Sequence, residues 1–98
     1  MIVYYFTNIS VSLEKVDEYL DAHMMYLNEE YKKGHFISSG RKIPRTGGII
    51  LSTVKSKAIL MRILEKDPFY QHELAAYNIT EFFPSMTASG YEILKEVK

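Results

Sequence analysis

The segment YLDAHMMYLNEEY, residues 19–31, has the apolar periodicity of a helix that packs against a sheet. The predicted buried face comprises Leu13, Val16, Leu20, His23, Met24, Leu27 and Tyr31. We expect one helix over residues 13–33, with Ser12 as its N-cap and Gly34 just beyond its end. Because His23 points inward, its imidazole needs a hydrogen-bond partner or serves in proton transfer.

The segments on either side of this helix give the order of the other elements. Aromatic and β-branched residues predict strands over residues 2–7, 35–40, 48–54 and 77–85. A second helix is expected over residues 56–66, with an inner face of Ala58, Ile59, Ile63 and Leu64, and a short helical turn within residues 67–77. The order β-α-β-β-α-β predicts an α+β, ferredoxin-like fold whose antiparallel sheet has its helices on one face.

The sheet face without helices is also expected to carry apolar side chains, which must be buried against something. The first strand is apolar on both alternating sets of side chains, and Phe82 and Phe83 are expected on opposite sides of the last strand. We therefore expect two copies to pack sheet against sheet as a symmetric homodimer, although the sequence does not distinguish a dimer from a ring of dimers. Residues 1–84 would form the domain and residues 85–98 a tail, whose end fits a short helix or an added strand.

Composition narrows the class of protein. The chain has 98 residues, of which 47% are hydrophobic, so we expect one globular domain. Its formal net charge of zero disfavours nucleic acid as a partner. The chain has no cysteine, no basic leader and no apolar run long enough to span a bilayer. These features predict a cytoplasmic protein with a small molecule or a protein as partner, and no membrane association.

Spacing brings His23 together with a carboxylate. His23 lies eleven positions after Ser12, and Asp67 lies eleven positions after Ser56, the expected start of the second helix. Both residues are then roughly 16 Å along neighbouring helices whose axes pack about 8–10 Å apart. A carboxylate on one ring nitrogen is the arrangement of a general base. On the pattern alone, the simpler reading stays ahead: Asp67 only ends its helix before Pro68, and His23 bonds a backbone carbonyl.

The segment SSGRKIPRTGG, residues 38–48, is a second candidate for binding. Ser39 offers a hydroxyl, the glycines at 40, 47 and 48 let backbone N–H groups approach a ligand, and Arg45 could hold a carboxylate or enolate oxygen. The alternative is a hairpin loop in which Gly-Gly makes the turn. Phosphate-loop and dinucleotide motifs are missing, and the histidines lack metal-ligand spacing, so we expect neither an organic cofactor nor a metal.

Five short segments in order support a resemblance to a known family. They are the first strand, AHMMYL at 22–27, SSG at 38–40, PRTGG at 44–48 and DPF at 67–69. Over residues 1–84 the chain resembles the YCII-related (YciI-like) family of the dimeric α+β barrel superfamily, which also holds muconolactone isomerase-like proteins. One departure is Arg41, because the family often continues Ser-Gly with Pro.

The resemblance implies a ferredoxin-like homodimer in which His23 and Asp67 form a suspected catalytic pair. It also implies a pocket lined by Ser39, Gly40, Thr46 and Gly47. A few relatives act as dehydrochlorinases of the hydroxyhydroquinone type, which implies chemistry that begins with proton abstraction.

Three functions follow as hypotheses. The first is a lyase- or isomerase-like enzyme without organic cofactor, in which His23 is the base, Asp67 orients it, and Arg45 and the loop amides stabilise an oxyanion. The second is a ligand-binding or regulatory dimer without turnover, whose ligand affinity survives His23→Gln. The third, haem or oxygen chemistry, is disfavoured because the chain has no Trp and no second inward His.

Overall fold

The computed structural model describes residues 2–8 and 12–95. Its four strands are β1 (Ile2–Asn8), β2 (Phe36–Arg41), β3 (Gly47–Ser52) and β4 (Ala75–Glu81). They form one sheet in the order β2-β3-β1-β4, and each neighbouring pair is antiparallel. This is the ferredoxin-like topology, so the predicted α+β fold class is confirmed.

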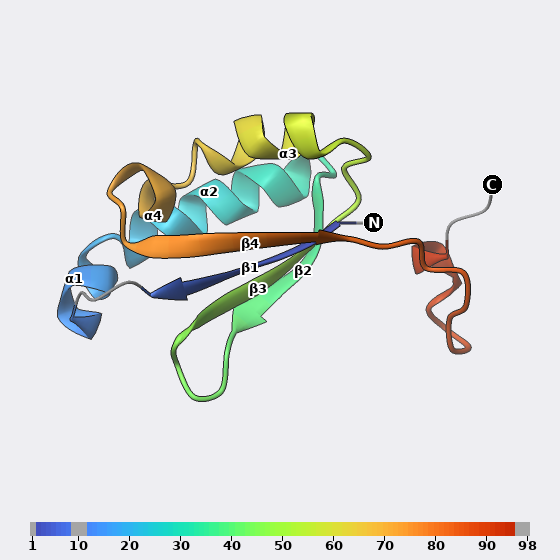
Figure 1. The fold of residues 1–98 in the computed structure, drawn as a ribbon, viewed down its shortest axis with the longest axis horizontal. Coiled ribbons are helices and arrows are strands. Elements are labelled where there is room, and N and C mark those ends of the chain that lie inside the picture. The colour runs from blue at the N-terminus through green and yellow to red at the C-terminus, as the bar shows by residue number, and fades with distance from the viewer. Residues whose placement is uncertain (1, 9–11, 96–98) are drawn as a thin grey trace.

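The helices are α1 (Leu13–Glu18), α2 (Leu20–Lys32), α3 (Lys57–Leu64) and the single turn α4 (Pro68–Gln71), followed near the end by a 3-10 turn over Glu92–Leu94. Helices α2, α3 and α4 lie together on one side of the sheet, as Figure 1 shows. The core fills the space between these helices and the sheet, with Tyr4, Ile50, Leu60 and Leu64 fully buried at its centre. None of the described helices is long and apolar enough to cross a membrane.

The predicted single helix over residues 13–33 is wrong, because the chain turns at Tyr19 and makes two helices. Tyr19 has φ −106° and ψ 4°, outside the helical region, and its N–H bonds the carbonyl of Val16 at 3.1 Å. Ser12 does cap α1, since its hydroxyl accepts from the N–H of Lys15 at 3.2 Å. The turn points α1 away from the axis of α2, toward the end of the sheet (Figure 1).

The buried face of these helices differs accordingly from the predicted stripe. Leu13 and Met24 are about half exposed, whereas Tyr26 and Glu30 are buried. In α3 the same kind of shift occurs: Leu60 is fully buried while Ala58 and Ile59 are exposed. Helix phase is fixed by packing on the sheet, which the apolar pattern alone locates only to within one residue.

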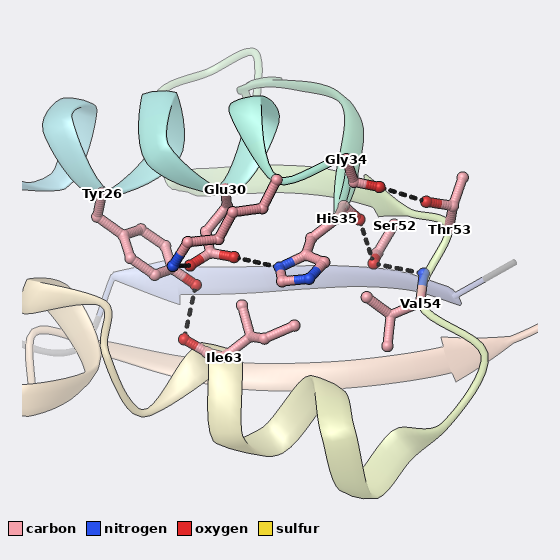
Figure 2. A network of polar contacts seen from close by, with 9 residues as sticks. Tyr26, Glu30, Gly34, His35, Ser52, Thr53, Val54 and Ile63 are labelled. Carbon is pink, nitrogen blue, oxygen red and sulfur yellow. Dashed lines mark hydrogen bonds and ion pairs between the residues drawn. The ribbon is translucent and has the colours of Figure 1, made fainter.

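A polar network fastens the last turns of α2 to the sheet and to α3 (Figure 2). The carboxylate of Glu30, only 2% exposed, meets Nδ1 of His35 at 2.5 Å, just before β2 begins. The hydroxyl of Ser52 donates to the carbonyl of His35 at 2.7 Å, and the Tyr26 hydroxyl donates to the carbonyl of Ile63 at 3.0 Å. Through Tyr26 and Glu30, α2 is thus tied to α3 and to the residue that precedes β2.

The sheet face opposite the helices is open in the single chain. Tyr5 of β1 and Ile49 of β3 are cross-strand partners on this face, and each is more than one third exposed. Strand β4 ends before Phe82 and Phe83, which the sequence places inside the last strand. Beyond them the chain leads away from the sheet (Figure 1). The homodimer and the domain boundary at residue 84 stay predictions.

Candidate active site

His23 and Asp67 are in direct contact inside the protein. Nδ1 of His23 lies 2.8 Å from Oδ1 of Asp67, and both side chains are buried. Because a carboxylate only accepts, Nδ1 carries the proton and Nε2 is the acceptor nitrogen of the neutral ring. The spacing argument from the sequence therefore predicts this contact correctly, although it assumed an unbroken helix up to His23.

The carboxylate of Asp67 is held by two further donors. Its Oδ1 accepts from the backbone N–H of Phe69 at 2.9 Å, which makes Asp67 the N-cap of α4. Its Oδ2 accepts from the hydroxyl of Tyr77 in β4 at 3.0 Å. A fully buried carboxylate with three donors is fixed in position.

The imidazole ring is held by aromatic contacts as well. It stacks on the ring of Phe69 with centroids 4.0 Å apart and planes 1° apart, and it meets the edge of Phe6 at 5.8 Å. Two residues of the segment 67–69 thus hold the imidazole ring: Asp67 binds Nδ1 at its edge, and Phe69 stacks on its face. No described residue hydrogen-bonds Nε2.

Burial and charge also act on the phenols beside this pair. Burial raises the pKa of Tyr77, and the negative charge of Asp67 raises it further. Burial likewise raises the pKa of Tyr4 and of Tyr26. The Tyr77 phenol therefore keeps its proton and acts as a donor to Asp67. Among the described residues, the hydroxyl of Tyr4 is the one fully buried side-chain polar atom without a hydrogen bond.

His23 faces a cavity of about 200 Å³ between the helices and the end of the sheet. Most of its wall is apolar, with side chains that include Phe6, Val16, Leu20, Met24, Leu27, Ile50 and Phe69. The polar side chains in the wall are those of His23, Ser39, Arg41 and Arg45. A dry cavity of about 150 Å³ takes up benzene, so this one admits a compound with a single substituted ring.

Ser39 reaches the cavity because β2 contains an irregularity. Phe36 pairs with Ser52 and Ser38 pairs with Leu51, which are adjacent residues of β3, so Ile37 is an extra residue of β2 without a partner in the register. This bulge puts Phe36 and Ser39, three positions apart, on the same face of the sheet. The hydroxyl of Ser39 lies 2.5 Å from that of Tyr31, which orients it.

The other predicted binding residues divide into three kinds. Gly40 and Gly47 line the cavity. Arg45 also lines it, but its guanidinium forms an ion pair with Asp17 of α1. Thr46 is exposed, bonds the carbonyl of Pro44 at 3.3 Å, and is not among the lining residues of the described chain.

The glycines at 47 and 48 serve the packing of β3 rather than only a ligand. A Cβ at Gly47 would lie 1.8 Å from the backbone oxygen of Phe6, and one at Gly48 would lie 2.6 Å from the Phe6 ring. Both positions therefore exclude a side chain because β1 passes close by.

Sequence reasoning missed Phe69 and Tyr77 and did not assign Arg41 to the cavity. The sequence did hold a signal for Phe69. An aspartate at an N-cap accepts a hydrogen bond from the backbone N–H two or three residues later, so Phe69 was expected close to the carboxylate of Asp67. Nothing in the sequence pairs Tyr77 with Asp67. In the described part of the chain, no group of three His, Asp or Glu side chains is placed to hold a metal ion.

Comparisons with known proteins agree with the fold described above. The family model of the YCII-related domain matches residues 1–83. Seven chains of solved structures match, among them 5-chloro-2-hydroxyhydroquinone dehydrochlorinase (TftG) from Burkholderia phenoliruptrix AC1100, in complex with 2,5-dihydroxybenzoquinone. That chain has a TM-score of 0.72 and 20% identity, with 83% of this chain and 91% of that chain covered, a likeness that shows the fold. No curated protein matches this chain.

Proposed function

The chain belongs to the YCII-related domain family, and from this premise we propose that it is a small-molecule enzyme with His23 as general base. The observation that carries the proposal is the imidazole itself: Nδ1 is tied to buried Asp67, and Nε2 has no partner in the described chain and faces an apolar cavity. The substrate class is a small hydroxylated cyclic or aromatic compound.

The proposed step is a proton abstraction. Nε2 of His23 takes a proton from a carbon or hydroxyl of the substrate, and the electron pair left behind develops into an oxyanion or expels a leaving group. Asp67 stabilises the resulting imidazolium without taking its proton. Ser39, Gly40, Arg45 and Gly47, all in the wall of the cavity, are the proposed binding residues; Thr46 would act only from outside it.

The dehydrochlorinase with the same fold supports this class of reaction. Its name describes elimination from a chlorinated hydroxyhydroquinone, and its bound 2,5-dihydroxybenzoquinone has one six-membered ring. A single ring is also what the cavity of this chain admits.

We also propose that two copies pack through the open sheet face, and that the protein is cytoplasmic, as the sequence suggests. The exposed cross-strand pair Tyr5 and Ile49 supports the dimer. A non-catalytic, ligand-binding dimer is the second candidate, because an apolar cavity with one oriented histidine also suits a receptor.

The proposal is tested with His23→Gln, assayed against chlorinated hydroxyhydroquinones. We expect kcat to fall by about 10²–10⁴, the usual contribution of a general base, while the affinity for 2,5-dihydroxybenzoquinone changes little. His72→Gln is the matched control, because His72 is exposed and stacks on Tyr19 away from the cavity. A wild-type protein that binds the quinone but turns over no compound of this class would favour the binding dimer.

A further inference from the structure

We propose that the ligand of this cavity is an anion at neutral pH, with a carboxylate on a single ring, and that Arg41 recognises it. This inference rests on the proposed site and goes further by naming the charge of the substrate. It also assigns a specificity role to Arg41.

Arg41 stands on the cavity side of the sheet. It is the last residue of β2 and lies two positions after Ser39, so the two side chains share a face. Both residues line the cavity, and Arg41 is exposed at its rim. The position opposite Arg41 on β3 is Gly48, where the Phe6 ring leaves no room for a side chain. The guanidinium therefore has open space next to the cavity.

In the described part of the chain, Arg41 has no ion-pair partner. No carboxylate of the described residues lies within ion-pair distance of it. The neighbouring cations are engaged: Arg45 pairs with Asp17, and the Lys42 ammonium bonds the hydroxyl of Thr7 at 3.1 Å and lies 4.9 Å from the centre of the Tyr5 ring. Asp67 already accepts three hydrogen bonds behind the imidazole.

No described residue in the wall carries a carboxylate. A cavity with apolar walls and one unpaired guanidinium at its rim attracts an anion, and the planar fork of Arg matches a carboxylate with two parallel hydrogen bonds. Nε2 of His23, also in the wall, accepts from a hydroxyl or activated C–H of the same molecule. The ligand that satisfies both groups is a one-ring hydroxy acid.

The test compares two probes of nearly the same shape, the anion 2,5-dihydroxybenzoate and the neutral 2,5-dihydroxybenzamide, by calorimetric titration. We expect the wild-type protein to bind the acid roughly 10- to 100-fold more tightly than the amide, the range for a charge-assisted hydrogen bond. In Arg41→Gln the two affinities should become equal, with that of the amide unchanged. Added salt should reduce the wild-type preference.

Arg62→Gln is the matched control, because it removes the same charge from an exposed position in α3, outside the cavity wall. It should keep the full preference for the acid. Equal affinities in the wild type, binding of neither probe, or a preference that survives in Arg41→Gln would overturn the assignment.

Turnover measured in parallel separates this inference from the proposed function. An Arg41-dependent preference for the acid without His23-dependent turnover supports the anion site and rejects the enzyme. His23-dependent turnover of neutral hydroquinones without any preference for the acid overturns the anion site and leaves the enzyme standing.

Discussion

Asp67 shows how much a single side chain of this protein holds in place. One oxygen binds both the imidazole of His23 and the N–H that starts α4, and the other binds the phenol of Tyr77. A change at Asp67 therefore alters the ring orientation, a helix start and a strand contact together. Asp67→Asn keeps the acceptor oxygen and removes the charge, so it separates the electrostatic part from the positioning part.

The tyrosines near Asp67 predict how stability depends on pH. Burial raises the pKa of Tyr4, Tyr26 and Tyr77 above the ordinary value of about 10. Their contribution to stability is thus complete below pH 10 and is lost as the pH rises toward the folded-state values. Above about pH 10 the free energy of unfolding should fall by up to about 1.4 kcal/mol per pH unit for each such phenol.

Tyrosinate absorbance and circular dichroism, recorded together in an alkaline titration, check this dependence. The last phase of tyrosinate absorbance should coincide with the loss of secondary structure, and Tyr77→Phe should make that phase smaller. Complete ionisation of all phenols before any change in circular dichroism would contradict the prediction.

At the level of the elements, β3 lies so close to β1 that an added side chain at Gly47 does not fit. A Cβ at Gly47 would lie 1.8 Å from the backbone oxygen of Phe6, whereas one at Gly40 would meet no atom within 4 Å. We expect Gly47→Ala to lower the free energy of unfolding by about 3 kcal/mol, and Gly40→Ala to change it by less than about 1 kcal/mol. Urea unfolding of both variants measures this, and equal effects would show that β3 can move away from β1.

Most of the helices and strands can be predicted from the sequence. Periodicity and end signals locate all four strands, and Ser12 and Ser56 cap the helices that follow them. The break at Tyr19 was not predictable, since the helical pattern continues through it without Pro or Gly. Contacts distant in sequence, such as Arg45 with Asp17, hold α1 at its own angle.

For the site, the sequence predicts the His23–Asp67 contact by counting positions along two helices, although the structure breaks the first helix at Tyr19 and ends the second at Leu64. The wall of the cavity is predicted less well. Its polar side chains depend on the bulge at Ile37, which turns the following residues of β2, and simple alternation does not reveal a bulge. Arg41 consequently looked like a loop residue.

For the whole molecule, the open sheet face predicts the state of assembly. A glutamate at position 5 would place a charge at the centre of that face, so Tyr5→Glu should raise the dissociation constant of the proposed dimer roughly 30-fold or more. Light scattering after size-exclusion chromatography measures the mass. Met25→Glu is the control, because Met25 is 70% exposed on the other side of the molecule, in α2. A monomeric wild type would refute the dimer.

The two members of the His–Asp pair lie 44 residues apart, His23 in the first β-α-β half of the fold and Asp67 in the second. Neither half contains both residues, so the proposed chemistry requires the two halves to be folded together. If either half unfolds, the contact between His23 and Asp67 is lost entirely. Activity followed through a denaturant titration should therefore report the fraction of chains that are folded throughout.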